Sequence, residues 1–255
     1  MPVDFGKTAS DYARHRAGFP EQFFDRLFQS GIAARTDRML DLGTGTGTVA
    51  RGFARRGCVV TGLDPSRAML DQAERLDREA GVSIRYIEAT AEETGLTSHN
   101  FDVVTAGQCW HWFDRRRAAS EARRLLAPGG RMIIAHFDWL PLPGNVVEAT
   151  EALIRQHNPP WDGDDGTGIH PQRFADLAGA GFEHIESFTF DVTVTYSRDA
   201  WLGRIRASSG VGASLSPGAV ARFDSAHREL LERRFPDDPL KIPHRIFVVF
   251  GRVPG

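Results

Sequence analysis

Three glycines and one aspartate have the spacing of a site for a nucleoside-containing ligand. Gly43, Gly45 and Gly47 alternate with threonines directly after the apolar run Met39–Leu42. Such a turn lets the backbone bend sharply and lets a ligand lie against it with no Cβ between them. Asp64 ends a second apolar run about 20 residues beyond the first glycine, where a neighbouring strand would present its carboxylate to a ribose diol. The sequence therefore predicts a nucleoside-containing cofactor at this turn.

A second set of residues could carry the reaction. The loop Gly107–Phe113, which contains Trp-His-Trp, follows the apolar run Phe101–Ala106. Open α/β sheets bind their ligands at the carboxyl ends of their strands. His111 is the first candidate for a general base because an imidazole titrates near neutral pH, and the flanking indoles would exclude water from it. His136, at the end of the next apolar run, is the second candidate. The alternative for each histidine is a structural role.

Composition excludes several classes of protein. The 255 residues carry a formal net charge of −2, and their basic and acidic residues are interspersed. Such a chain has no basic block for nucleic acid or for an anionic membrane. Cys58 and Cys109 lack metal-ligand spacing, so reduced thiols and a cytoplasmic location are expected. No run has the length of a signal peptide or of a membrane span. We expect a small-molecule substrate and a monomer or homodimer.

Alternating strands and helices must position these residues. Apolar runs predict strands at about 39–42, 58–64, 83–88, 101–106, 131–137, 182–195 and 245–253. Helical periodicity and caps predict helices at about 48–56, 65–80, 115–126, 146–156 and 216–234. Strands that alternate with helices and follow glycine-rich turns indicate an α/β fold, with a mostly parallel sheet covered on both faces.

Several motifs, taken in order, resemble one enzyme family. The run Asp41–Gly47 (Asp-Leu-Gly-Thr-Gly-Thr-Gly) resembles the first motif of class I S-adenosylmethionine-dependent methyltransferases. Gln108–Trp112 resembles the fourth motif, above all in the branch that includes the trans-aconitate methyltransferases. The turn Leu126–Gly130 (Leu-Ala-Pro-Gly-Gly) is also typical of the family, and the resemblance covers about residues 5–138. Gly45–Ala50 alone also fits the dinucleotide pattern, so an NAD(P)-dependent oxidoreductase is one alternative. A non-catalytic binding protein with the same fold is another.

The resemblance implies a fold and a reaction. It implies a Rossmann-like, doubly wound sheet of seven strands, with the last strand antiparallel, in one domain over residues 1–255. Within it, residues 1–35 would form an N-terminal helical cap, 36–138 the cofactor-binding core, 139–180 an inserted lid and 181–255 the C-terminal strands and helices. The implied cofactor is S-adenosyl-L-methionine, which becomes S-adenosyl-L-homocysteine when its methyl group passes to an oxygen, nitrogen or carbon nucleophile of a small molecule.

The resemblance also assigns cofactor contacts. Tyr12 and Arg16 would lie over the methionyl end of the cofactor, and Gln108 near the same group. Thr90 stands where the family usually has the acid that accepts from the adenine amine, so Thr90 or Glu92 would accept that hydrogen bond. Met69 would pack on the adenine, or else in the core. The full predicted set is Tyr12, Arg16, Gly43, Thr44, Gly45, Gly47, Asp64, Pro65, Met69, Thr90, Ala91, Glu92 and Gln108.

The acceptor is expected near aromatic residues that follow the strands. The predicted substrate pocket comprises Trp110, His111, Trp112, Phe137, Trp139, Trp201 and Arg204. A carboxylate acceptor would need an arginine, and Arg204 or Arg206 is the candidate. The acidic loop at residues 162–165 matches no calcium loop, so we predict a solvated loop and no metal site.

Overall fold

The computed structural model describes residues 18–161, 163 and 166–255, which fall into two compact units. The unit here called the sheet unit comprises Gly18–Phe137, Ile169–Phe190 and Ile246–Gly255. The other, called the helical unit, has as its described parts Asp138–Gly168 and Asp191–Arg245, without residues 162, 164 and 165. The predicted contacts of Tyr12 and Arg16, and most of the acidic loop, lie outside the described residues. The single domain and its lid stay predictions.

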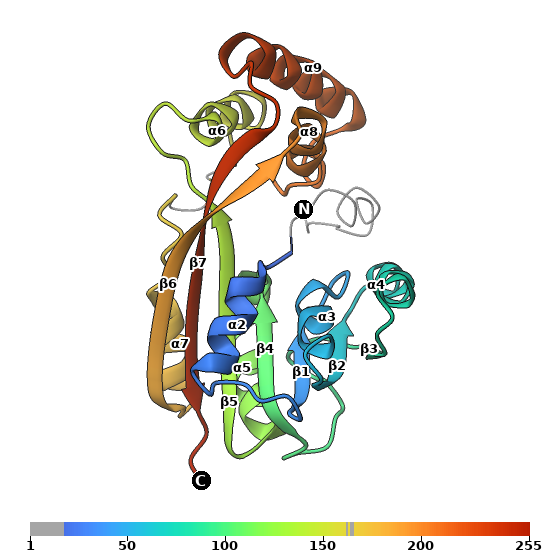
Figure 1. The fold of residues 1–255 in the computed structure, drawn as a ribbon, viewed down its shortest axis with the longest axis vertical. Coiled ribbons are helices and arrows are strands. Elements are labelled where there is room, and N and C mark those ends of the chain that lie inside the picture. The colour runs from blue at the N-terminus through green and yellow to red at the C-terminus, as the bar shows by residue number, and fades with distance from the viewer. Residues whose placement is uncertain (1–17, 162, 164–165) are drawn as a thin grey trace. The chain divides into compact units, whose positions relative to one another are not determined.

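Seven strands form one sheet in the order β3-β2-β1-β4-β5-β7-β6 (Figure 1). Their bounds are β1 Arg38–Leu42, β2 Val59–Asp64, β3 Arg85–Glu88, β4 Phe101–Gly107, β5 Leu126–Trp139, β6 Glu183–Tyr196 and β7 Leu240–Arg252. The pairs β1–β2, β1–β4, β2–β3 and β4–β5 are parallel. β7 runs against its neighbours in Figure 1. The predicted strands and the mostly parallel, Rossmann-like sheet are confirmed.

Helices cover the strands of the sheet unit. They are α2 Glu21–Gln29, α3 Thr48–Ala54, α4 Arg67–Ala80, α5 Arg115–Leu125 and α7 Gln172–Gly179. Each of these helices turns apolar side chains inward; α2, for example, buries Phe23, Phe24 and Leu27. The parallel strands themselves are almost continuously apolar, as expected for a sheet covered on both faces. Their side chains form a core with those of α5 and α7.

The turn predicted at Leu126–Gly130 lies inside β5. Phe101 pairs with Leu126 and Val103 with Arg131, so residues 127–130 bulge out of the pairing with β4. The last part of the chain stabilises this bulge, because the Val253 N–H donates to the Gly130 carbonyl at 3.0 Å. A bulge of this kind keeps the strand continuous while it bends the backbone.

The helical unit contains α6 Val146–His157, α8 Arg198–Arg206 and α9 Pro217–Arg234. They pack around a core of their own, in which Trp201, Phe223, Leu231 and Ile242 are almost fully buried. Side chains of Asn145 and Ser197 accept backbone N–H groups at the starts of α6 and α8, as N-caps do. None of the described helices combines the length and the apolar character needed to cross a membrane.

Candidate functional site

The predicted chemical residues of the sheet unit meet at one edge of the sheet. Leu42 pairs with Leu63 and Gly107 with Ala135 in parallel register. Gly43, Asp64 and Gln108 therefore stand at the carboxyl ends of three neighbouring strands, and His136 of β5 is level with the end of β4. This edge is where open α/β folds place their ligands.

The three glycines of the first turn have different surroundings. A Cβ on Gly43 would meet the Phe113 ring at 2.9 Å, and a Cβ on Gly47 would meet the Tyr86 hydroxyl at 2.4 Å. Gly45 has a φ of +54°, and no atom lies within 4 Å of the position its Cβ would take. Gly43 and Gly47 thus allow close packing of the protein, whereas Gly45 borders open space that a ligand could fill.

Asp64 holds the open side of this turn. Its Oδ2 accepts from the Gly45 N–H and its Oδ1 from the Ser66 N–H, both at 2.9 Å. Burial raises the pKa of Asp64, while these two bonds act to lower it. Each carboxylate oxygen keeps a second acceptor position, because it has more than one lone pair. Asp64 can therefore accept ribose hydroxyls without releasing the turn.

Asp41 supports the same turn from inside the sheet. The Thr44 hydroxyl donates to one of its oxygens and the Thr105 hydroxyl of β4 to the other, each at 2.7 Å. The side chain is almost fully buried, and this burial raises its pKa to about 6. Asp41 opens the glycine motif, but its type and position alone did not predict a contact for it. Its role is to tie the predicted ligand residue Thr44 to the sheet.

A buried network of hydrogen bonds and an ion pair lies below the turn, and the sequence did not predict it. Arg51 of α3 pairs with Asp77 of α4 at 2.7 Å and donates to the Thr46 carbonyl at 2.9 Å. The Tyr86 hydroxyl of β3 donates to the other oxygen of Asp77 at 2.8 Å. Burial raises the pKa of Tyr86, so its hydroxyl remains a donor. Three elements thus fix the peptide between Gly45 and Gly47.

The loop predicted to read adenine follows β3. Thr90 is exposed and Ala91 is buried. The Glu92 carboxylate accepts from the Asp114 N–H at 2.8 Å, just before α5. One oxygen of Glu92 thus already has a partner within the protein, so Thr90 is the more accessible of the two candidate acceptors. The adenine contacts themselves stay predictions.

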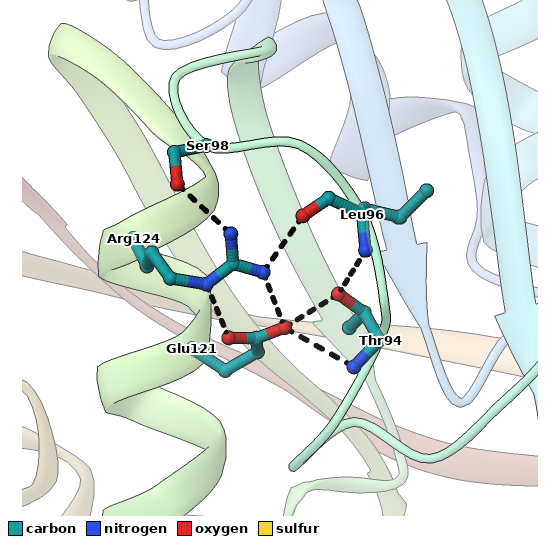
Figure 2. Close-up of polar contacts among 5 residues, drawn as sticks. All are labelled: Thr94, Leu96, Ser98, Glu121 and Arg124. Carbon is teal, nitrogen blue, oxygen red and sulfur yellow. Dashed lines mark hydrogen bonds and ion pairs between the residues drawn. The ribbon is translucent and has the colours of Figure 1, made fainter.

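An ion pair on α5 anchors the continuation of this loop (Figure 2). Arg124 contacts both oxygens of Glu121 at 2.7 Å and donates to the Leu96 carbonyl and the Ser98 hydroxyl, both at 2.9 Å. Glu121 also accepts from the Thr94 N–H at 3.1 Å. Arg124 lowers the pKa of Glu121 to about 2, so this clamp stays charged at neutral pH. It fixes the chain that leaves the predicted adenine loop.

Two further predicted contacts lie at the start of α4. Pro65 is exposed next to Asp64, whereas Met69 is 4% exposed and packs among the buried residues of α4. The second interpretation of Met69, as a core residue, matches this burial. Pro65 stands beside the open turn.

Gln108 joins the ends of two strands. Its backbone N–H donates to the Ala135 carbonyl at 2.9 Å, and its side-chain amide donates to the Phe137 carbonyl. Its φ of +61° is unusual for a residue with a side chain. Strained backbone of this kind is concentrated at binding and catalytic sites. Phe137 itself is 7% exposed and lies with its ring 5.6 Å from that of Phe19.

The Trp-His-Trp loop forms a short 3₁₀ helix with its tryptophans on different sides. Trp110 is fully buried, and its indole N–H donates to Asp176 of α7 at 2.9 Å. Trp112 is 47% exposed, and His111 is also exposed. The expectation that both indoles shield His111 from water is wrong, because Trp110 is anchored in the core. The predicted contact of Trp110 with the substrate stays a prediction.

His136 is a less accessible histidine. It is 2% exposed, its ring stacks on that of His170 at 3.8 Å, and the ring of His111 lies 6.3 Å away. The Arg173 Nε–H of α7 donates to His136 Nε2 at 3.3 Å. That nitrogen therefore already accepts a hydrogen bond beside a cation. The geometry favours His111 over His136 as the general base.

The other predicted substrate residues belong to the helical unit. The rings of Trp139 and Trp201 meet edge to face at 5.5 Å, and the Arg204 guanidinium lies 4.7 Å above the Trp139 ring. Arg206 instead pairs with Asp224 of α9 at 2.7 Å. The structure thus separates the two arginines that the sequence left as equal candidates.

Comparison with known proteins adds a family to this geometry. Residues 40–134 match the family model described as a methyltransferase domain. An uncharacterised methyltransferase of Mycobacterium tuberculosis (strain ATCC 25618 / H37Rv) is 39% identical over 132 residues, which are 52% of this chain and 51% of that protein. The match thus spans about half the length of this curated relative.

Solved structures with the same fold extend the similarity beyond that region. A protein of Anaeromyxobacter dehalogenans assigned as a type II methyltransferase has a TM-score of 0.67 and 27% identity, over 94% of this chain and 99% of that chain. A phosphoethanolamine N-methyltransferase of Haemonchus contortus, in complex with S-adenosyl-L-methionine, has a TM-score of 0.56 over 98% of this chain and 57% of that chain. Its identity of 22% supports the fold alone.

Proposed function

We propose that the chain is a class I S-adenosylmethionine-dependent methyltransferase, which transfers a methyl group from S-adenosyl-L-methionine to a small molecule; its similarity to methyltransferases over residues 40–134 supports this. One observation carries the proposal. The space beside Gly45 is open, and the Asp64 carboxylate borders it with free acceptor positions. This arrangement fits the cofactor. A ribose offers two hydroxyl donors to the Asp64 carboxylate, and it needs close approach to the backbone, which Gly45 allows.

When bound, the cofactor supplies an electrophilic methyl group on a sulfonium. The remaining task of the protein is alignment and the exclusion of water, since the transfer is an in-line displacement. In this proposal Asp64 and the turn at Gly45 hold the nucleoside, and the loop at Thr90 reads the adenine. Gln108, whose side-chain amide donates to the Phe137 carbonyl, would lie near the methionyl group.

Cofactor identity can be tested without knowledge of the acceptor. The purified chain is titrated calorimetrically with S-adenosylhomocysteine and with NAD, and co-purifying nucleotides are identified by mass spectrometry. The proposal requires S-adenosylhomocysteine to bind more tightly than NAD. Tighter binding of NAD would support the oxidoreductase alternative. If S-adenosylhomocysteine binds but S-adenosylmethionine methylates no compound in a broad screen of acceptors, the result favours the alternative of a non-catalytic binding protein.

His111 is the proposed general base for an acceptor that carries a proton. The imidazole is exposed at the ligand edge, where it can take a proton and pass it to water. We expect His111→Asn to lower turnover about 10²–10⁴-fold, because a positioned base contributes that much. Affinity for S-adenosylhomocysteine should not change. The matched control is His184→Asn, which alters another exposed histidine of the sheet unit. Equal turnover in wild type and His111→Asn across pH would exclude this role.

The cellular setting stays a prediction. Cys58 and Cys109 are both buried, and burial raises the pKa of the Cys58 thiol to about 12, so the Cys58 thiol is unreactive. An inert thiol is compatible with the cytoplasm that we propose. We also propose a monomer or homodimer that acts on a small molecule.

A further inference from the structure

We propose that Arg204, on the face of Trp139 in the helical unit, binds the carboxylate group of a small organic acid. This binding does not depend on the proposed methyl transfer. Arg204 lies in the last turn of α8, and its Cζ is 4.7 Å from the centre of the Trp139 ring. Both residues belong to the helical unit.

The Trp139 ring is a rigid platform. Its indole N–H donates to Glu151 Oε1 of α6 at 2.8 Å, and the other oxygen of Glu151 pairs with Arg155 at 3.0 Å. The edge of Trp201, which is fully buried, packs against the same ring at 5.5 Å. A fixed aromatic face orients a planar guanidinium that lies on it. Arg204 is thereby held in a defined orientation.

Arg204 has no carboxylate at ion-pair distance within residues 18–161, 163 and 166–255, although the Tyr196 hydroxyl is a hydrogen-bond neighbour. Arg206 of the same helix, in contrast, pairs with Asp224 at 2.7 Å. Burial lowers the pKa of Arg204 and outweighs the Tyr196 hydroxyl and the Asp138 carboxylate, which favour the charged form. A partly buried cation without a paired anion is costly, which an anionic ligand would relieve.

The neighbouring histidine adds no competing charge. His244 lies close enough for its own titration to respond to Arg204 and to Asp138. Burial lowers the pKa of His244 to about 4, so it is neutral at physiological pH. Arg204 is therefore the positive centre of this group of residues.

The chemistry of the side chain selects the ligand. A guanidinium presents parallel N–H donors in a plane, which match the two oxygens of a carboxylate. The Trp139 face offers apolar contact to a carbon skeleton attached to that carboxylate. The guanidinium also fits phosphate, so the apolar Trp139 face is what favours an organic acid. We therefore assign a small carboxylic acid as the ligand class and expect inorganic phosphate to bind more weakly.

The test uses the full chain without cofactor. Phenylacetate, succinate and inorganic phosphate are titrated by calorimetry at neutral pH. We expect the carboxylates to bind, and Arg204→Met to weaken them about tenfold or more through loss of charge-assisted hydrogen bonds. Arg204→Lys should fall between, since it keeps the charge and loses the planar fork. Arg206→Met, the matched control, should bind them as wild type does. Circular dichroism verifies that each variant is folded.

Three results would overturn the proposal. They are failure of every carboxylate to bind, equal binding to wild type and Arg204→Met, and phosphate binding as tight as that of the carboxylates. The proposed function is tested separately by the affinity of the same variants for S-adenosylhomocysteine. Arg204→Met should retain that affinity. Its loss would be a fourth result against the proposal, because the variant would then have lost more than a separate carboxylate ligand.

Discussion

Gly45 and Gly47 have the same backbone conformation for different reasons. Their φ angles are +54° and +77°, in the left-handed region that disfavours a side chain. At Gly47 the Tyr86 hydroxyl occupies the space where a Cβ would lie, whereas at Gly45 that space is empty. Substitution at Gly45 therefore tests the ligand site, and substitution at Gly47 tests mainly the fold.

Gly45→Ala should cost about 1 kcal/mol of stability through backbone strain. It should also weaken S-adenosylhomocysteine about tenfold or more, because the methyl group takes up ligand space. Gly81→Ala is the matched control: Gly81 ends α4 with a φ of +67° and also has no atom within 4 Å of its Cβ position. Thermal unfolding and calorimetry should give similar losses of stability but an affinity loss only at Gly45. Equal affinities would place the ligand elsewhere.

Local motifs made part of this site predictable. Gly43 and Asp64 stand where the sequence places them because each directly follows an apolar strand, and parallel strands end at one edge. The anchoring of Trp110 by Asp176 could not be foreseen, since the two residues are 66 positions apart. Nothing near Trp110 in the sequence indicates that its indole is buried. A contact between residues so far apart in the sequence depends on how α7 packs against the rest of the sheet unit.

At the scale of elements, α3, α4 and β3 meet below the glycine turn. Arg51, Asp77 and Tyr86 come from these three elements and bond in one chain that ends at the Thr46 carbonyl. A buried network in which every member is bonded holds its backbone rigidly. The turn is thus shaped by residues that lie outside the motif.

Tyr86→Phe should lower the free energy of unfolding by about 1–2 kcal/mol, because Asp77 loses a buried donor. Affinity for S-adenosylhomocysteine should fall severalfold, since Arg51 then holds the Thr46 carbonyl less firmly. Tyr196→Phe makes the same chemical change in the helical unit and should leave that affinity unaltered. Urea unfolding and calorimetry measure both effects. A Tyr86→Phe variant with wild-type affinity would show that the network serves stability only.

Apolar runs in the sequence predicted where the strands lie. The errors are in the strand boundaries, which depend on pairing with neighbouring strands. The strand predicted at 131–137 is β5, but its pairing begins at Leu126, because residues 127–130 bulge without ending the ladder. The last strand, β7, begins at Leu240 and not at the predicted residue 245. Strand ends depend on partners distant in sequence, which hydropathy does not report.

At the scale of the whole molecule, the two units respond differently to acid. His227 of α9 is fully buried, and burial lowers its pKa to about 4 from an ordinary 6.5. His244 has the same shift. Both take up a proton more readily when the chain is unfolded, so they destabilise the helical unit as the pH falls below 6.5 toward 4. Asp41 has the opposite effect in the sheet unit, because its pKa is raised to about 6.

Each of the two histidines should therefore cost up to about 3 kcal/mol of stability between about pH 6.5 and pH 4. Hydrogen exchange, corrected for the intrinsic effect of pH, should show α6, α8 and α9 losing protection at about pH 5 while β1 and β4 keep theirs. His227→Gln should reduce the loss, and His184→Asn, which alters an exposed histidine, should not. Uniform protection at both pH values would refute this assignment.

The central claim is that S-adenosylmethionine binds beside Gly45 through the Asp64 carboxylate. Calorimetric titration of S-adenosylhomocysteine into wild type and Asp64→Ala tests it most directly. The variant should lose about 2 kcal/mol or more of affinity, because hydrogen bonds to a charged group disappear. Asp102→Ala is the control, since that carboxylate pairs with Arg38 at the far end of β4. Unchanged affinity in a folded Asp64→Ala protein would contradict the claim.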